Sequence, residues 1–138
     1  MGNDSTRHVH ADYDVIAAMG DSDPDEPVVM LNLLKYREIA ESGYGVDGLT
    51  GRQAYTKYGE AFAELEPRFG GSVMWMGRAK HTVIGGDEDW DIIILVSYPT
   101  RRQFIDMFSD PDYKAIAPMR AAALADSRIV ESTQLVPR

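Results

Sequence analysis

The chain has 138 residues, a size typical of one domain with a single hydrophobic core. Apolar residues make up 44% and charged residues 26%, which is the range of folded globular proteins and not of disordered ones. The 14 basic and 22 acidic residues give a net charge of −8, which would repel phosphate backbones and anionic membrane surfaces. We therefore expect neither a nucleic-acid nor a membrane partner.

The absence of cysteine excludes disulfides, thiolate nucleophiles, iron–sulfur clusters and cysteine-bound zinc. No run approaches the about 20 apolar residues of a membrane span, and the N-terminus lacks the apolar core of a signal peptide. These features predict a cytoplasmic location.

The N-terminal part is polar and carries no sustained period over residues 1–14, which indicates a tail or a short leading helix. One or two helical turns are expected over 13–19, before the proline- and acid-rich run DSDPDEP. We therefore divide the chain into an N-terminal extension, residues 1–27, and a single domain, residues 28–138.

The domain begins with the run VVMLNLLKY, residues 28–36, which is nearly continuous in apolar residues and typical of a strand buried on both faces. A glycine-rich loop is expected over 42–51. Thr50 and Gln53 have capping-box spacing, so a helix should begin there. Its apolar residues recur in steps of three and four, which places them on one face. They are Tyr55, Tyr58, Phe62, Leu65 and Phe69.

Gly70 and Gly71 should end this helix, because glycine adopts the left-handed conformation without strain. A second capping-box pair, an Asp-Pro helix start and two further apolar runs define the rest of the chain. The predicted elements are strands over 72–84 and 90–98, helices over 100–108 and 110–125, and a last strand over 128–135. Pro118 is expected to kink or restart the second of these helices.

The predicted order β-α-β-β-α-β is the ferredoxin-like arrangement, an α+β fold with a four-stranded antiparallel sheet. Its two helical segments would cover one face of that sheet. Two strands nevertheless have the pattern of strands buried on both faces, and so short a chain has nothing left to cover the second face. A second copy packed sheet to sheet is the economical solution, which predicts a homodimer.

Four stretches resemble the DUF1330 family of small uncharacterised proteins, which belongs to the dimeric α+β barrel superfamily. They are VVMLNLLKY, YTKYGEAF, the Gly-Gly pair before the second strand, and YPTRRQFIDMFSDPDYKAIAPMRAAAL. The resemblance covers roughly residues 28–132; the extension before Val28 and the loop 41–51 depart from it. It implies a barrel shared by two protomers, with a pocket inside the barrel or between each sheet and its helices. Superfamily relatives include cofactor-free monooxygenases, haem-dependent enzymes, and isomerases or lyases of aromatic catabolism, so the fold alone does not assign an activity.

Asn32 is the polar residue in the middle of the first apolar strand, on the same face as Met30, Leu34 and Tyr36. A buried amide requires partners, because leaving it unpaired costs about 1–3 kcal/mol. It is either a substrate-binding group inside the barrel or a structural amide bonded to backbone or water.

Two residues are candidates for catalysis. Arg120 follows Tyr113 by seven residues and Ile116 by four, so an unbroken helix would place all three on one side. Its guanidinium is suited to hold a carboxylate or enolate oxygen; the alternative is an ion pair with one of the many acids. His81, on one strand face with Trp75, could act as a general base; the alternative is a histidine at an exposed strand end.

Aromatic side chains form the predicted substrate-binding wall, since they offer stacking surfaces and hydroxyl donors for a flat ligand. They are Tyr36, Tyr55, Tyr58, Trp75, Tyr98 and Tyr113, with Trp90 nearby. The alternative is that Tyr55 and Tyr58 simply belong to the core-facing stripe of their helix.

No metal or other cofactor is expected. His8 and His10 have H-x-H spacing beside Asp12 and Asp14, but they lie in the predicted tail. The glycines of residues 43–51 match neither nucleotide-binding pattern.

Three functions remain open from the sequence. In the first, a cofactor-independent enzyme acts on a small aromatic or carbonyl-bearing molecule; Arg120 or Asn32 stabilises an oxyanion, and His81 or a tyrosine moves a proton. In the second, the chain is a non-catalytic small-molecule-binding or stress-associated dimer. The third, a haem-handling protein with His81 as axial ligand, ranks behind both.

Overall fold

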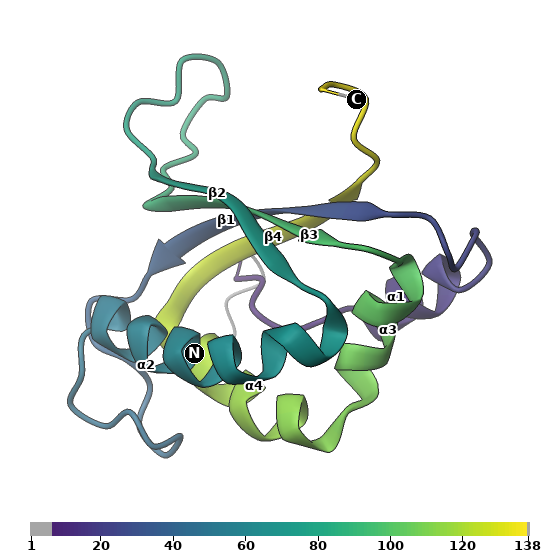
Figure 1. The fold of residues 1–138 in the computed structure, drawn as a ribbon. Coiled ribbons are helices and arrows are strands. Elements are labelled where there is room, and N and C mark those ends of the chain that lie inside the picture. Colours follow the sequence, from purple (N-terminus) through teal and green to yellow (C-terminus); the bar gives the residue numbers. More distant parts are fainter. Residues whose placement is uncertain (1–6, 138) are drawn as a thin grey trace.

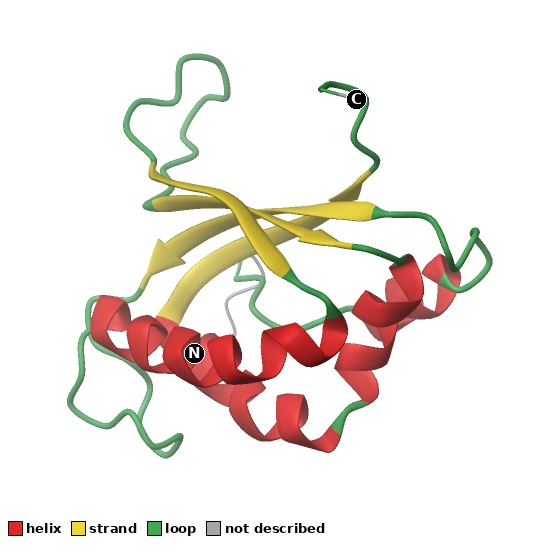
Figure 2. Cartoon of the chain, in the orientation of Figure 1, coloured by secondary structure: helices red, strands yellow, loops and turns green. Residues whose placement is uncertain are grey.

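The computed structural model describes residues 7–137 as one antiparallel sheet with helices packed against it (Figure 1). The elements are α1 (Tyr13–Met19), β1 (Val28–Tyr36), α2 (Gly51–Leu65), the 3₁₀ helix η1 (Glu66–Phe69), β2 (Ser72–Arg78), β3 (Ile92–Tyr98), α3 (Arg101–Ser109), α4 (Pro111–Ala123) and β4 (Leu124–Ser132). Figure 2 shows α2, α3 and α4 on the same side of the sheet. The strand order β2-β3-β1-β4, with every pair antiparallel, confirms the predicted ferredoxin-like α+β fold.

Strand β1 occupies a central position, with β3 on one side and β4 on the other. Met30, Asn32 and Leu34 alternate along it toward the helices and are buried, as strand periodicity requires. Met30 and Leu34 pack with apolar residues of β3 and of the three larger helices in one core. Among the described residues, no helix is long and apolar enough to cross a membrane.

The helix starts follow the capping signals of the sequence. Thr50 and Gln53 form both halves of the capping box of α2, and the Asp110 carboxylate accepts from two backbone N–H groups at the start of α4. Helix α4 continues through Pro118, so the restart considered there does not occur. This continuity places Tyr113 and Arg120 on the same buried side.

Four strand boundaries differ from the sequence prediction: the start of β3 and the end of β4 move by two and three residues, and two others move further. Strand β2 ends at Arg78 and not near residue 84, because Arg78 pairs with Ile92, the first residue of β3. The apolar residues that follow are therefore a long exposed loop. Strand β4 begins at Leu124, four residues early, where it pairs with Tyr36 of β1. The alanine-rich sequence before it is typical of helix and hid this boundary.

The sheet face opposite the helices carries a row of apolar side chains. Trp75, Leu95, Leu31 and Val130 pair across the four strands, and the exposed fractions of Trp75 and Val130 are 52% and 51%. Beyond this face project the β2–β3 loop and the C-terminal tail (Figure 1). Each carries a pair of exposed apolar side chains. These are Val83, Ile84, Leu135 and Val136.

Candidate functional site

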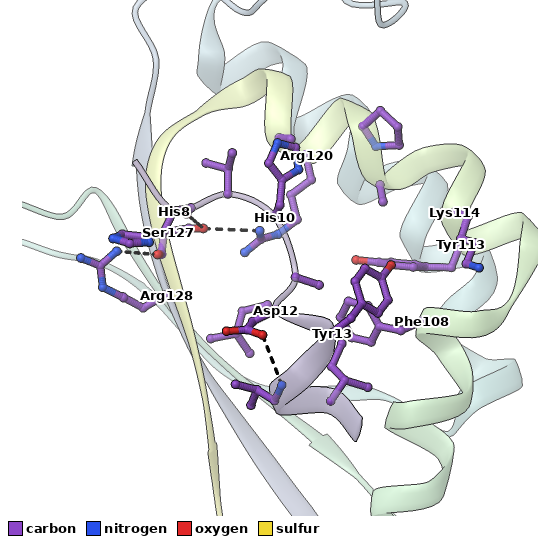
Figure 3. A pocket seen from close by; sticks show the side chains of 18 of the residues that line it. His8, His10, Asp12, Tyr13, Phe108, Tyr113, Lys114, Arg120, Ser127 and Arg128 are labelled. Atoms are coloured by element: carbon purple, nitrogen blue, oxygen red, sulfur yellow. Dashed lines mark hydrogen bonds between the residues drawn. The ribbon is translucent and has the colours of Figure 1, made fainter. Parts of the chain in front are cut away.

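A cavity of about 810 Å³ lies between the N-terminal segment (residues 7–19), helix α4 and strand β4. This volume falls in the range of about 300–1,000 Å³ that is typical of small-molecule sites. Figure 3 shows Arg120 and Ser127 facing Tyr113 and Phe108 across it. The cavity thus lies on the helix side of the sheet and not on the open face.

The N-terminal segment is fixed against the end of α4 by polar contacts. The Arg7 guanidinium donates to the Glu41 carboxylate at 2.6 Å and to the Ala121 carbonyl at 2.8 Å. The Ser127 hydroxyl donates to the His8 carbonyl at 2.7 Å. The sequence predicted a tail or a short helix here; the structure shows that residues 7–19 also form one wall of the cavity.

Arg120 is the central polar residue of the cavity. It lies in the last turn of α4, and only 7% of its surface is exposed. Its Nη1 atom reaches the Ser127 hydroxyl at 3.5 Å, the limit of a hydrogen bond, and its Nη2 atom is buried with no partner. No carboxylate of residues 7–137 forms an ion pair with it, so the ion-pair alternative finds no partner in the part of the chain described.

A tyrosine cluster lies behind Arg120, between α2 and α4. The Tyr55 ring packs on Tyr36 and on Tyr58, with centroids 6.1 and 5.4 Å apart, and the Tyr58 hydroxyl lies 3.3 Å from that of Tyr113. Burial raises the pKa of Tyr58 well above its ordinary value. Burial also raises the pKa of Tyr55, which the Arg120 charge partly opposes. These phenols are neutral near pH 7, so they serve as hydrogen-bonding groups and not as bases.

Two other predicted site residues lie in the core and do not line the cavity. The buried Asn32 amide donates to the Met30 carbonyl of its own strand at 3.2 Å. The Tyr98 hydroxyl lies 3.8 Å from the Met107 sulfur, and burial, with the nearby Glu66 carboxylate, raises the pKa of Tyr98. Of the predicted group, Arg120 and Tyr113 therefore come together at the cavity.

The prediction that His81 lies on a strand with Trp75 was wrong, because β2 ends at Arg78. His81 lies in the exposed β2–β3 loop, and Trp75 lies on the open sheet face. The Arg128 guanidinium lies over the Trp90 ring, with its Cζ atom 5.2 Å from the ring centroid. None of the three aromatic side chains lines the cavity.

The cavity includes residues that the sequence did not single out. Phe104 and Phe108, one helical turn apart on α3, form an apolar wall, and their spacing of four was a readable signal. No sequence signal indicated Ser127, because the strand that contains it was predicted to begin only at residue 128. His8, His10 and Asp12, which the sequence analysis assigned to a tail, also line the cavity. No three His, Asp or Glu side chains among residues 7–137 gather to hold a metal.

Among the solved structures similar to this chain are two of a protein of unknown function from Rhodopseudomonas palustris. Its crystal structure is 34% identical to this chain, with a TM-score of 0.86, and the alignment covers 96% of this chain and 100% of that one. The methylated form of the protein aligns with a TM-score of 0.87 at the same identity, over 96% of this chain and 98% of its own. The alignments therefore include most of the segment before Val28.

A dimeric protein of unknown function and ferredoxin-like fold from Bacteroides fragilis is also similar, with a TM-score of 0.51 and 14% identity. That alignment covers 78% of this chain and 96% of that one, and it supports the fold alone. No curated protein matches. The family described as "Domain of unknown function (DUF1330)" matches residues 46–133. Together with the 34% identity to the Rhodopseudomonas palustris protein, this match shows that the chain belongs to the DUF1330 family.

Proposed function

We propose that the chain binds a small carbonyl-bearing molecule in the cavity between the N-terminal segment, α4 and β4. The observation that carries this proposal is Arg120, a buried cation in the cavity wall whose Nη2 atom has no partner. A buried charge is costly unless it is paired and hydrogen-bonded. A bound oxygen atom would supply the missing acceptor.

The other groups around Arg120 suit such a ligand. A guanidinium presents two parallel donors to a carbonyl or carboxylate oxygen. The Tyr113 hydroxyl lies in the same cavity and can donate a further hydrogen bond to that oxygen when the Tyr58 hydroxyl donates to Tyr113. Apolar side chains form much of the remaining wall, as is usual for small-molecule sites.

Helix α4 offers a matched pair of variants to test this site. Ala117 lines the cavity, whereas Ala115 is exposed on the outer side of the same helix. A panel of small acidic, neutral and basic aromatic molecules would be screened for compounds that raise the melting temperature of the wild type. We expect Ala117→Trp to abolish the stabilisation and Ala115→Trp to retain it. Equal responses of the two variants, or no stabilising compound, would contradict the site.

A second candidate is cofactor-independent catalysis at the same place. In this reaction a water molecule in the cavity would take an α-hydrogen of the bound ketone as a proton, and deuterated water would return a deuteron to the same carbon. The Arg120 guanidinium would hold the enolate oxygen formed in between, and the hydroxyl pair of Tyr58 and Tyr113 beside it would donate a hydrogen bond. The test is exchange of the α-hydrogens of a bound ketone with deuterated water, followed by NMR. An enzyme accelerates this exchange without added metal and loses the acceleration in Tyr113→Phe; a pure binder leaves the rate unchanged. The haem alternative gains no support, because His81 lies away from the cavity in an exposed loop.

We also propose that two copies associate through the open sheet face. The apolar row from Trp75 to Val130 supports this, as does the projection of both loop and tail beyond the same face. Contiguous exposed apolar surface on a folded chain is typical of an interface. The Bacteroides fragilis protein of the same fold is described as dimeric, which supports association of two copies.

A further inference from the structure

We infer that the ligand of the cavity is a monocarboxylate with a flat, apolar ring system. Its carboxylate would bind to Arg120, and its ring system would lie against α1 and α3. This inference rests on the proposed binding function and names the class of ligand.

The charges around the cavity favour an anion. Its carboxylates are already engaged: Glu41 pairs with Arg7 at 2.6 Å, and Glu131 pairs with Arg101 at 2.6 Å. The Asp12 carboxylate caps α1 by accepting two backbone N–H groups. Among the described lining residues, Arg120 has no anionic partner, so the cavity carries an uncompensated positive charge in a protein of net charge −8.

The position of Arg120 favours one negative charge and not two. It lies in the last turn of α4, where the helix carbonyls carry partial negative charge. That end of the helix holds a cation well and repels a dianion such as phosphate. The neighbouring Arg7 guanidinium is already bonded to Glu41 and to the carbonyls of Ala121 and Leu124. Lys114 also lines the cavity and forms no ion pair among the described residues, but its side chain is exposed and solvated. A single carboxylate, bound in the bidentate manner of a guanidinium, therefore matches the one buried cation that lacks a counter-ion.

The opposite part of the cavity determines the body of the ligand. Ile16 and Met19 of α1 line it, together with Phe104 and Phe108 of α3. The Phe104 and Phe108 rings meet edge to face with centroids 5.1 Å apart, and Phe108 meets Tyr113 in the same way at 5.3 Å. This apolar and largely aromatic wall fits a flat ring better than a polar chain.

This arrangement should lower the stability of the ligand-free protein, because the buried Arg120 guanidinium has no counter-ion. Replacing Arg120 by methionine, which has a similar shape and no charge, should therefore raise the melting temperature of the ligand-free protein while abolishing acid binding. A purely structural arginine would behave in the opposite way, since its loss would lower the melting temperature.

The test is calorimetric titration of the full chain with 2-naphthylacetate, its neutral amide 2-naphthylacetamide, and inorganic phosphate. Loss of a hydrogen-bonded charge contact typically weakens binding by about tenfold or more. We expect the acid to bind at least about tenfold more tightly than the amide, and phosphate not to compete with it. Arg120→Gln should remove the preference for the acid. The control Arg102→Gln should retain it, because Arg102 is exposed on α3 and pairs with Asp25.

Different failures have different meanings. If acid and amide bind equally in the wild type and both lose binding in Ala117→Trp, the cavity is a binding site but the ligand class is wrong. Competition by phosphate, or a lowered melting temperature for ligand-free Arg120→Met, would also overturn the inference. If no naphthyl compound binds the wild type, the monocarboxylate class is rejected, and the screen on Ala117→Trp and Ala115→Trp separately decides the proposed function.

Discussion

The hydroxyl of Tyr58 on α2 lies 3.3 Å from the hydroxyl of Tyr113 on α4. Both side chains are 5% exposed, and neither hydroxyl has another hydrogen-bond partner in the described part of the chain. The two environments differ, because Tyr113 also lines the cavity whereas Tyr58 does not. The contact therefore joins the two helices at the point where the core meets the candidate site.

Removing either hydroxyl should destabilise the protein unequally. Tyr113→Phe leaves the Tyr58 hydroxyl buried without a partner, which costs about 1–3 kcal/mol. Tyr58→Phe should cost less, because water in the cavity can bond to the Tyr113 hydroxyl. Free energies of unfolding from urea titration measure the difference, with Tyr44→Phe as the exposed control. Equal losses in the two variants would show that the cavity does not solvate Tyr113.

The carboxyl group of Glu66 should make stability depend on pH. Its Oε2 atom is buried without a partner, and burial raises the pKa of Glu66 above its ordinary value. The folded state therefore binds this proton more tightly than the unfolded chain does. The stabilisation that results is present below the ordinary glutamate pKa of about 4.3 and is lost as the pH rises through the raised value.

Replacement of this carboxyl by an amide removes the titration. Glu66→Gln should melt at a higher temperature than the wild type at pH 7, and the difference should disappear below about pH 4. Melting curves between pH 3.5 and about 8 test this, with Glu64→Gln on the exposed side of α2 as the control. A melting difference of the same size at every pH would rule out titration of Glu66 as its cause.

A charge on the open sheet face should prevent association of two copies. Val130 is 51% exposed on that face, whereas its neighbour Ile129 points to the helix side and is 40% exposed. We expect Val130→Lys to sediment as a monomer at concentrations where the wild type and Ile129→Lys sediment as dimers, because burying an unpaired ammonium group is costly. Dimeric Val130→Lys, or a monomeric wild type, would contradict an interface on this face.

Local chemistry explains why most of the fold was predictable. The pairs Thr50–Gln53 and Asp110–Pro111 mark helix starts through contacts that span only a few residues. The apolar run of β1 and the apolar residues along one side of α2 indicate which faces must be buried, and residues of both lie in the core. For the same reason the Tyr113–Arg120 alignment could be predicted from helical spacing once α4 was taken as unbroken.

The errors have a non-local origin. The apolar residues around His81 suit a strand, but a strand exists only where a neighbour pairs with it, and β3 begins at Ile92. Residues 7–19 have no strong period of their own. They become a cavity wall because Arg7 bonds to Glu41 and to the end of α4, more than a hundred residues further along the chain.

The sequence by itself determined the α+β class, the order of the elements, the amphipathic faces and the residue types able to bind a carbonyl, because these follow from periods and caps within a few residues. Only the tertiary structure decided that Arg120 meets no carboxylate of residues 7–137 and that the N-terminal segment closes a cavity over it. The state of a buried charge depends on every group packed around it, and those groups come from distant parts of the chain.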